Sequence, residues 1–232
     1  MTLHDRGRGP DPGPPLGPLA VVFTLLFVGG VAVATALAGG DTFPSPFGSA
    51  ATAASYFRDH RDAVRVSAFT QFAAAVPLAI YAATVSTRLR NYGIRVPGTT
   101  IALVGGVLAA TMLALSGLLC WVLSRVEVTD SNGAFRVFHD LSFATGGVAH
   151  VVFLGLLVAG IAVPGLLANL LPRPLALTGL VIAVMAELAS LALLIDGLAI
   201  LVPIGRFTAL GWLIAVGFMV RRNRVIRITD QN

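Results

Sequence analysis

Long apolar runs are the feature that most constrains how this 232-residue chain can fold. Several runs contain about 18 or more residues, enough for an α-helix to cross the roughly 30 Å hydrocarbon core of a bilayer. Hydrophobic residues make up 56% of the chain and charged residues only 12%, which is less charge than a soluble domain carries. The sequence therefore predicts an all-α, polytopic transmembrane helix bundle of about six spans.

The spans divide the chain into three parts. Residues 1–18 are rich in Pro, Gly and charge, which predicts a disordered N-terminal tail. Residues 19–220 form the predicted transmembrane domain, and residues 221–232 form a basic cytoplasmic tail. A short surface helix is expected over 49–60, and the expected spans are 19–38, 62–86, 99–124, 135–163, 175–195 and, after an interruption at Pro203, 207–220.

All sixteen basic residues are Arg, because the sequence contains no Lys. Ten of them lie in the two tails and in the connectors that follow the second and fourth spans, where only three acidic residues accompany them. The positive-inside rule places these segments and both termini on the cytoplasmic side. Orientation thus accounts for the sequence pI of 10.6. The expected partner is the lipid bilayer of a bacterial plasma membrane, and no nucleic acid.

Residue usage excludes several kinds of cofactor chemistry. Without Lys, the chain cannot form the Schiff base of a retinal protein or of a pyridoxal enzyme. Cys120 is the only cysteine, so neither an intrachain disulfide nor an iron–sulfur cluster can form, and we expect Cys120 to be a buried packing residue. The H-E-x-x-H, G-x-S-x-G and phosphate-loop motifs are missing from the sequence. The sequence therefore predicts no cofactor.

Polar residues within the apolar runs are candidates for function, because a charge at membrane depth costs several kcal/mol unless it is paired or hydrated. Glu187 lies about 13 Å below the outer end of the fifth span, at 1.5 Å per residue. Gln71, Ser116 and Thr145 fall at nearly the same depth on three other spans. We therefore expect an outward-facing polar cavity with Glu187 at its floor. The alternative is a protonated Glu187 that, like Gln71, only joins neighbouring helices by hydrogen bonds.

The fourth span carries a second pattern. Four of its residues recur at helical spacing and share one face, which we expect to be buried: His139, Ser142, Gly146 and His150. His150 either contacts Glu187, directly or through water, or is a packing histidine. His139 and His150 are about 16 Å apart along the helix axis and cannot bind one metal ion. Nearer the outer surface, the following residues either join the cavity or are solvated helix ends: Arg65, Asp140 and Arg206, with Asp59, His60, Asp62 and Asp196.

The connectors carry a family resemblance. The Arg-rich sequence STRLR at 86–90 follows the second span, and LPR at 171–173 precedes the LTGL run at 177–180. Together with the six spans, these motifs resemble an uncharacterised, actinobacterial-like family of six-span membrane proteins of unknown function, over most of the chain after the N-terminal tail. The resemblance implies the architecture and supplies no activity, ligand or catalytic residue.

Three classes of function remain open. The first, which we favour, is a binding or regulatory membrane protein that meets a small-molecule ligand in the outer cavity or a cytoplasmic partner at the basic C-terminal tail. The second is a small-molecule or proton-coupled carrier in which Glu187 titrates, although the spans lack evident broken-helix pairs. The third is an intramembrane enzyme that depends on a metal or a haem held by His60, His139 or Asp140.

Overall fold

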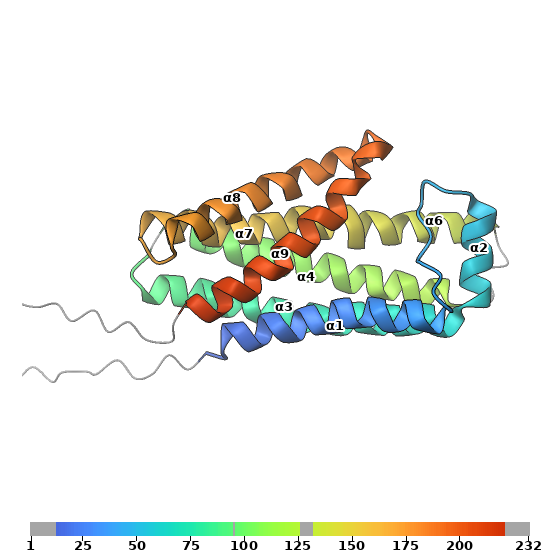
Figure 1. The fold of residues 1–232 in the computed structure, drawn as a ribbon, viewed down its shortest axis with the longest axis horizontal. Helices are drawn as coiled ribbons and strands as arrows, with labels where there is room; N and C mark the ends of the chain where they lie inside the picture. Colours follow the sequence, from blue (N-terminus) through green and yellow to red (C-terminus); the bar gives the residue numbers. More distant parts are fainter. Residues whose placement is uncertain (1–12, 95, 126–131, 221–232) are drawn as a thin grey trace, which may run out of the picture.

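The computed structural model describes residues 13–94, 96–125 and 132–220, and these residues are largely helical, with no β-strand among them (Figure 1). Six helical segments are long and apolar enough to cross a membrane. The predicted all-α fold class is therefore confirmed, and the six segments are compatible with the predicted bundle of about six spans. The segments are Leu16–Leu37, Arg61–Asn91, Pro97–Leu123, Gly133–Leu167, Arg173–Leu193 and Asp196–Met219.

Three of these segments are single α-helices, and three combine α-helix with a π-helical or 3-10 turn. A further short helix lies between the first and second segments. In chain order the elements are α1 (Leu16–Leu37), α2 (Ala50–Asp59), α3 (Arg61–Asn91), α4 (Pro97–Leu123), α6 (Asn132–Phe143), the π-helical turn η1 (Ala144–Ala149), α7 (His150–Leu167), α8 (Arg173–Leu188), the 3-10 turns η2 (Ala189–Leu193) and η3 (Asp196–Ile200), and α9 (Leu201–Met219).

Glycine and proline mark several helix ends. Gly39 follows α1 and Gly93 follows α3, and both have positive φ angles, of 68° and 82°. Glycine adopts this conformation at little cost because it has no side chain, so it often ends a helix. Pro97 opens α4 and Pro174 lies in the first turn of α8, where the missing N–H has no partner to lose.

The bundle has two distinct ends (Figure 1). The start of α1 and the end of α9 lie at the same end, where a Cβ atom on Gly217 would come within 2.9 Å of the Gly17 Cα. We call this the termini end. The opposite end carries α2 and the start of α6, and we call it the α2 end.

Close helix contacts depend on small residues. The helix pairs α3 with α4, α4 with α7, α1 with α3, and α7 with α8 form the main packing surfaces. A Cβ atom on Gly105 of α4 would lie 2.6 Å from the backbone nitrogen of Leu157 on α7, and Gly160 of α7 packs against Ala102 of α4. Backbones at this separation leave no room for a side chain, as in other membrane helix pairs.

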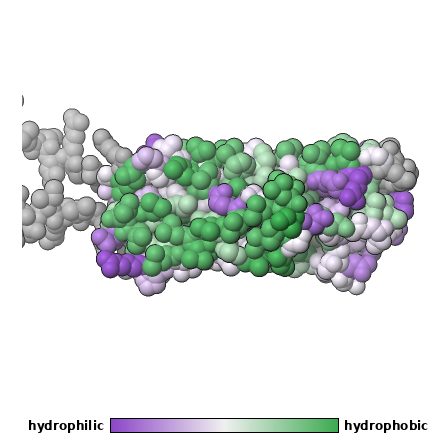
Figure 2. Space-filling view, turned by 90° about the horizontal axis from the view of Figure 1, so that it is seen from above, coloured by the Kyte–Doolittle hydropathy of each residue, from purple (hydrophilic) through white to green (hydrophobic). Residues whose placement is uncertain are grey.

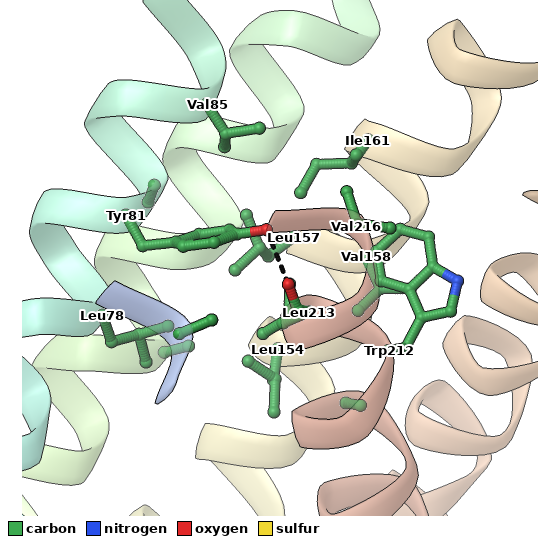
Figure 3. Close-up of a cluster of buried hydrophobic side chains, with 14 of the residues drawn as sticks. Leu78, Tyr81, Val85, Leu154, Leu157, Val158, Ile161, Trp212, Leu213 and Val216 are labelled. Carbon is green, nitrogen blue, oxygen red and sulfur yellow. Dashed lines mark hydrogen bonds between the residues drawn. The ribbon is translucent and has the colours of Figure 1, made fainter. Parts of the chain in front are cut away.

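One apolar cluster fills the middle of the bundle and encloses a single tyrosine hydroxyl (Figure 3). Tyr81 of α3 is 1% exposed, and its hydroxyl donates to the Leu213 carbonyl of α9 at 3.2 Å. Its ring lies among aliphatic side chains of α3, α7 and α9, including Leu78, Leu154 and Leu157. This hydrogen bond joins α3 to α9, two helices that do not otherwise pack extensively against each other.

Several helix boundaries differ from the prediction by a few residues, and two of the differences change the interpretation. Helix α3 continues to Asn91, so the Arg-rich sequence after the second span is helical rather than a connector. Arg88 is buried there, and its Nη2 donates to the Pro14 carbonyl at 2.8 Å. Helix α9 begins at Leu201, before Pro203, although we expected the uninterrupted helix only from residue 207. Pro203 falls in the first helical turn, where it breaks no hydrogen bond.

The surface pattern agrees with a spanning bundle. Figure 2 shows hydrophobic colouring over most of the length, with hydrophilic residues gathered toward the two ends and a smaller hydrophilic patch partway along. Large apolar side chains such as Phe69, Val181 and Phe218 are more than 60% exposed, which is expected where hydrocarbon covers them. Most of the predicted N-terminal tail and the whole basic C-terminal tail lie outside the described residues.

Candidate functional site

A polar layer joins three helices inside the bundle, at the depth counted from the sequence. The Ser116 hydroxyl of α4 lies 3.0 Å from the Ser142 carbonyl of α6 and 3.3 Å from Gln71 Oε1 of α3. Gln71 Nε2 donates to the Ser67 hydroxyl at 3.0 Å, and Cys120 Sγ lies 3.0 Å from Ser142 Oγ. These groups satisfy one another, so the layer is suited to holding helices together.

The π-helical turn η1 lies beside this layer. Gly146 within it packs directly on Ser116, because any side chain on Gly146 would collide with the Ser116 Oγ and Cβ atoms. On another side, Arg206 of α9 donates from Nη2 to the Gly146 carbonyl and, at 3.5 Å, to the Gly147 carbonyl. The guanidinium carbon also lies 4.9 Å from the centre of the Phe27 ring on α1. Arg206 therefore bridges α9, η1 and α1.

His150 is fully buried directly after this turn. Its Nδ1 atom lies 2.9 Å from the Ala109 carbonyl of α4, which requires Nδ1 to carry the proton. Arg206 lies close enough to His150 to interact with it electrostatically. The whole predicted face of the fourth span is buried, from His139 through Ser142 and Gly146 to His150.

Glu187 does not join this layer. Its side chain is exposed on α8, and no hydrogen bond or ion pair links its carboxylate to Gln71, Ser116 or His150. Thr145 is also separate, because its hydroxyl bonds to the Leu141 carbonyl of its own helix at 2.7 Å. In this structure Glu187 therefore does not form the floor of a polar cavity. The cause is the rotation of α8 about its own axis. The face that carries the small residues Ala183 and Ala186 packs against α7, and Glu187 lies to the side of that face.

At the α2 end, the chain folds back over the bundle and encloses His139. The His139 ring is 2% exposed and stacks on Phe135 at 5.6 Å between centroids. The Phe57 ring meets it edge-on at 5.5 Å, and the ring of Phe43 lies 6.3 Å away. His139 Nε2 also lies 3.3 Å from the Pro44 carbonyl. His139 thus anchors the segment 39–49 to the bundle.

Two predicted candidates take structural positions at this end. Asp140 accepts from Arg136 Nε at 3.0 Å, and Arg136 also donates to the Pro46 carbonyl at 3.0 Å. Arg65 is exposed and pairs with Asp62 one turn earlier at 3.5 Å, which is a weak contact at the surface. Neither Arg65 nor Asp140 faces the polar layer or lines the pocket described next.

A pocket of about 430 Å³ lies between the segment 39–49 and α2. Asp41, Asp59 and His60 line it, and the other polar groups in its wall are hydroxyls. His60 Nε2 lies 3.4 Å from Asp41 Oδ2, which joins the segment to the end of α2. The hydroxyl residues are Thr42, Ser45, Ser49, Thr52, Ser55 and Tyr56.

Tyr56 gives the pocket an aromatic wall. Its ring centroid lies 5.0 Å from that of His60 and 6.0 Å from that of Phe43. Burial, and then the neighbouring Asp41 carboxylate, raise the pKa of the Tyr56 phenol. The phenol therefore stays protonated at physiological pH and can donate a hydrogen bond into the pocket.

Metal or haem binding finds no support in the geometry. Within the described residues, no group of three or more His, Cys, Asp and Glu side chains could hold a metal ion. His139 is packed among aromatic rings with Nε2 directed at a carbonyl, and His60 is paired with Asp41. Ligation of a haem by these two histidines would require both contacts to be broken.

The fold defines the class: a helical bundle with six segments able to span a membrane and a pocket at one end. No family model, curated protein or solved structure matches the chain.

Sequence reasoning missed some of the residues that matter most. Asp41 and Tyr56 line the pocket, yet neither lies in an apolar run, where the candidates were sought. The density of hydroxyl and acidic residues between 41 and 60 was the available signal. Phe27 of α1 lies near Arg206 only because of how α1 and α9 pack, which the sequence pattern does not contain.

Proposed function

We propose that this chain is a multi-pass protein of a bacterial plasma membrane, with both termini cytoplasmic, that binds a small organic cation in the α2-end pocket. The observation that carries the ligand class is the charge of the wall. Two carboxylates, Asp41 and Asp59, line the pocket, and none of the described Arg residues does. Hydroxyls and the Tyr56 ring supply hydrogen bonds and a π face, both of which suit an ammonium group.

Charge at the two ends supports the orientation. The described Arg residues at the termini end are Arg88, Arg90 and Arg173, and no acidic residue accompanies them in the described chain there. Apart from Glu187, the described carboxylates lie near helix ends or in loops toward the α2 end. There they offset the positive charge of the Arg residues at that end. By the positive-inside rule, the pocket then faces the outside of the cell.

Calorimetric titration tests this proposal. Full-length protein in lipid nanodiscs is titrated with putrescine and with ethanolamine, and erythritol serves as an uncharged hydroxylated compound. We expect at least one amine to bind and erythritol to bind at least about tenfold more weakly, because a charge-assisted hydrogen bond is worth roughly 1.5–3 kcal/mol. Asp41→Asn and Asp59→Asn should each raise the dissociation constant of that amine about tenfold.

Asp62→Asn is the matched control. Asp62 is a neighbouring carboxylate that is 86% exposed and pairs with Arg65 outside the pocket wall. Its replacement should leave the dissociation constant unchanged. Equal binding of erythritol and the amines, or amine binding that survives both pocket substitutions, would show that the pocket is not a cation site.

A further inference from the structure

Arg206 places a permanent positive charge deep in the sixth spanning segment. It follows Asp196 by ten residues in the sequence, about 15 Å of helix at 1.5 Å per residue. A guanidinium stays protonated at physiological pH. In the described part of the chain, the ion pairs found do not involve Arg206. A charge at this depth is costly without compensation, and the carbonyl groups of Gly146 and Gly147 supply only dipoles.

Two buried nitrogen atoms near this charge have no hydrogen-bond partner among the described residues: Nε of Arg206 and Nε2 of His150. Their roles are complementary. Arg206 Nε–H is a donor. Because His150 Nδ1 carries the proton and donates a hydrogen bond to the Ala109 carbonyl, Nε2 of the neutral ring is an acceptor. An unpaired buried donor and an unpaired buried acceptor each cost free energy.

Both residues adjoin the π-helical turn. Arg206 contacts the carbonyl of Gly146, and His150 follows Gly146 by four residues, so it lies on nearly the same face about one turn away. A third polar atom without a partner, Thr24 Oγ1, belongs to α1. Thr24 is one turn from Phe27, whose ring meets the Arg206 guanidinium.

We propose that Arg206 and His150 form an intramembrane site for a small oxyanion that retains a hydroxyl group, of which bicarbonate is the simplest. The charged oxygen accepts from Arg206 Nε–H, and the hydroxyl donates to His150 Nε2. Chloride supplies the charge but no hydroxyl, so it would leave His150 Nε2 unpaired and should bind less tightly. The site differs from the α2-end pocket in position and in the sign of the ligand's charge.

The test measures bicarbonate and chloride binding to the full-length protein in detergent micelles at pH 8 and matched sodium concentration. The readout is the shift of the thermal unfolding midpoint with anion concentration, which reports binding to the folded state. We expect a saturable rise with bicarbonate and a dissociation constant at least about tenfold weaker for chloride. Arg206→Gln should abolish the bicarbonate effect, and His150→Phe should remove the preference for bicarbonate over chloride.

Arg65→Gln is the matched control, because Arg65 is an exposed Arg that touches neither His150 nor η1. It should respond to bicarbonate as the wild type does. Equal responses to chloride and bicarbonate in the wild type, no response to either, or an unchanged response in Arg206→Gln would each overturn the proposal. If Arg206→Gln fails to fold, the wild-type ratio of bicarbonate to chloride affinity still decides. None of these outcomes depends on amine binding in the pocket.

Discussion

Tyr81 shows what one hydroxyl contributes within this bundle. Its ring is packed among aliphatic side chains, and its hydroxyl reaches a backbone carbonyl on α9 (Figure 3). Removing the hydroxyl would leave the ring in place and the Leu213 carbonyl without this donor. The side chain therefore separates the contribution of a hydrogen bond from that of packing.

Tyr81→Phe should lower the free energy of unfolding by about 0.5–1.5 kcal/mol, the usual net value of a buried hydrogen bond. Unfolding of the protein in mixed micelles by increasing SDS measures this quantity. Thr111→Val is the control, because the Thr111 hydroxyl bonds only to the Val107 carbonyl of its own helix and is exposed. A loss no larger than that of the control would mean that the interhelical bond adds no stability.

The residue scale also shows where sequence reasoning succeeds. Counting 1.5 Å per residue placed Gln71 and Ser116 at one depth, and they meet at 3.3 Å. The same count gave a depth for Glu187 but not its rotation about the helix axis. Helix α8 is apolar nearly all round, so its hydrophobic pattern does not say which side faces the bundle. Packing of its small residues decides that, and it leaves Glu187 exposed.

At the scale of elements, α4 and α7 are held by reciprocal glycine contacts. Gly105 meets the backbone of Leu157, and Gly160 meets the backbone of Ala102. A methyl group at either position has to push backbone atoms, which cannot rotate away as a side chain can. The contact surface is therefore more sensitive to added volume than to lost polarity.

Gly105→Ala should destabilise the protein by about 1–3 kcal/mol, because it overpacks a rigid contact. Gly211→Ala is the matched control, since Gly211 is also helical and nothing lies within 4 Å of the position that its new methyl group would take. That substitution should be neutral or stabilise by up to about 1 kcal/mol through helix propensity. Comparison of the two unfolding midpoints checks the prediction, and similar midpoints would contradict it.

The lengths of the apolar runs predicted the helices that can span a membrane, because length and hydropathy alone decide whether a helix can cross the hydrocarbon core. The same argument does not detect η1 or η2. In a run that is apolar throughout, a π-helical turn does not alter the hydrophobic pattern of the sequence. The position of the turn depends instead on contacts such as that of Arg206 with Gly146. The Gly146-Gly147 pair was the only local sign. The fourth and fifth spanning segments therefore contain a π-helical turn and a 3-10 turn that the apolar pattern did not predict.

The whole molecule is asymmetric between its ends. At the termini end the described helix ends carry Arg88, Arg90 and Arg173, and no described acidic residue accompanies them there. At the α2 end, the segment 39–49 and α2 form a polar covering layer with a pocket. This difference makes the orientation in the membrane measurable with a single kind of reagent.

Gly197→Cys should react with a membrane-impermeant maleimide on intact cells, and Asn91→Cys only after the membrane is broken. Gly197 is exposed in the turn between α8 and α9, which lies toward the α2 end, and Asn91 is exposed where α3 ends at the termini end. The native Cys120 is 1% exposed and should contribute little background. If Asn91→Cys were labelled in intact cells and Gly197→Cys were protected, the orientation would be the opposite of the one proposed.

The anchoring of the segment 39–49 has a consequence for how the chain is made. Pro44 and Pro46 leave the ribosome early, but their partners His139 and Arg136 follow about ninety residues later. During insertion, the first two spans can enter the bilayer while this segment is still without its anchor. The covering layer is completed only when the start of the fourth span has been translocated. In the proposed orientation, extracytoplasmic proteases should therefore cleave this exposed segment faster in a nascent chain halted before α6 than in the finished chain, where it is anchored.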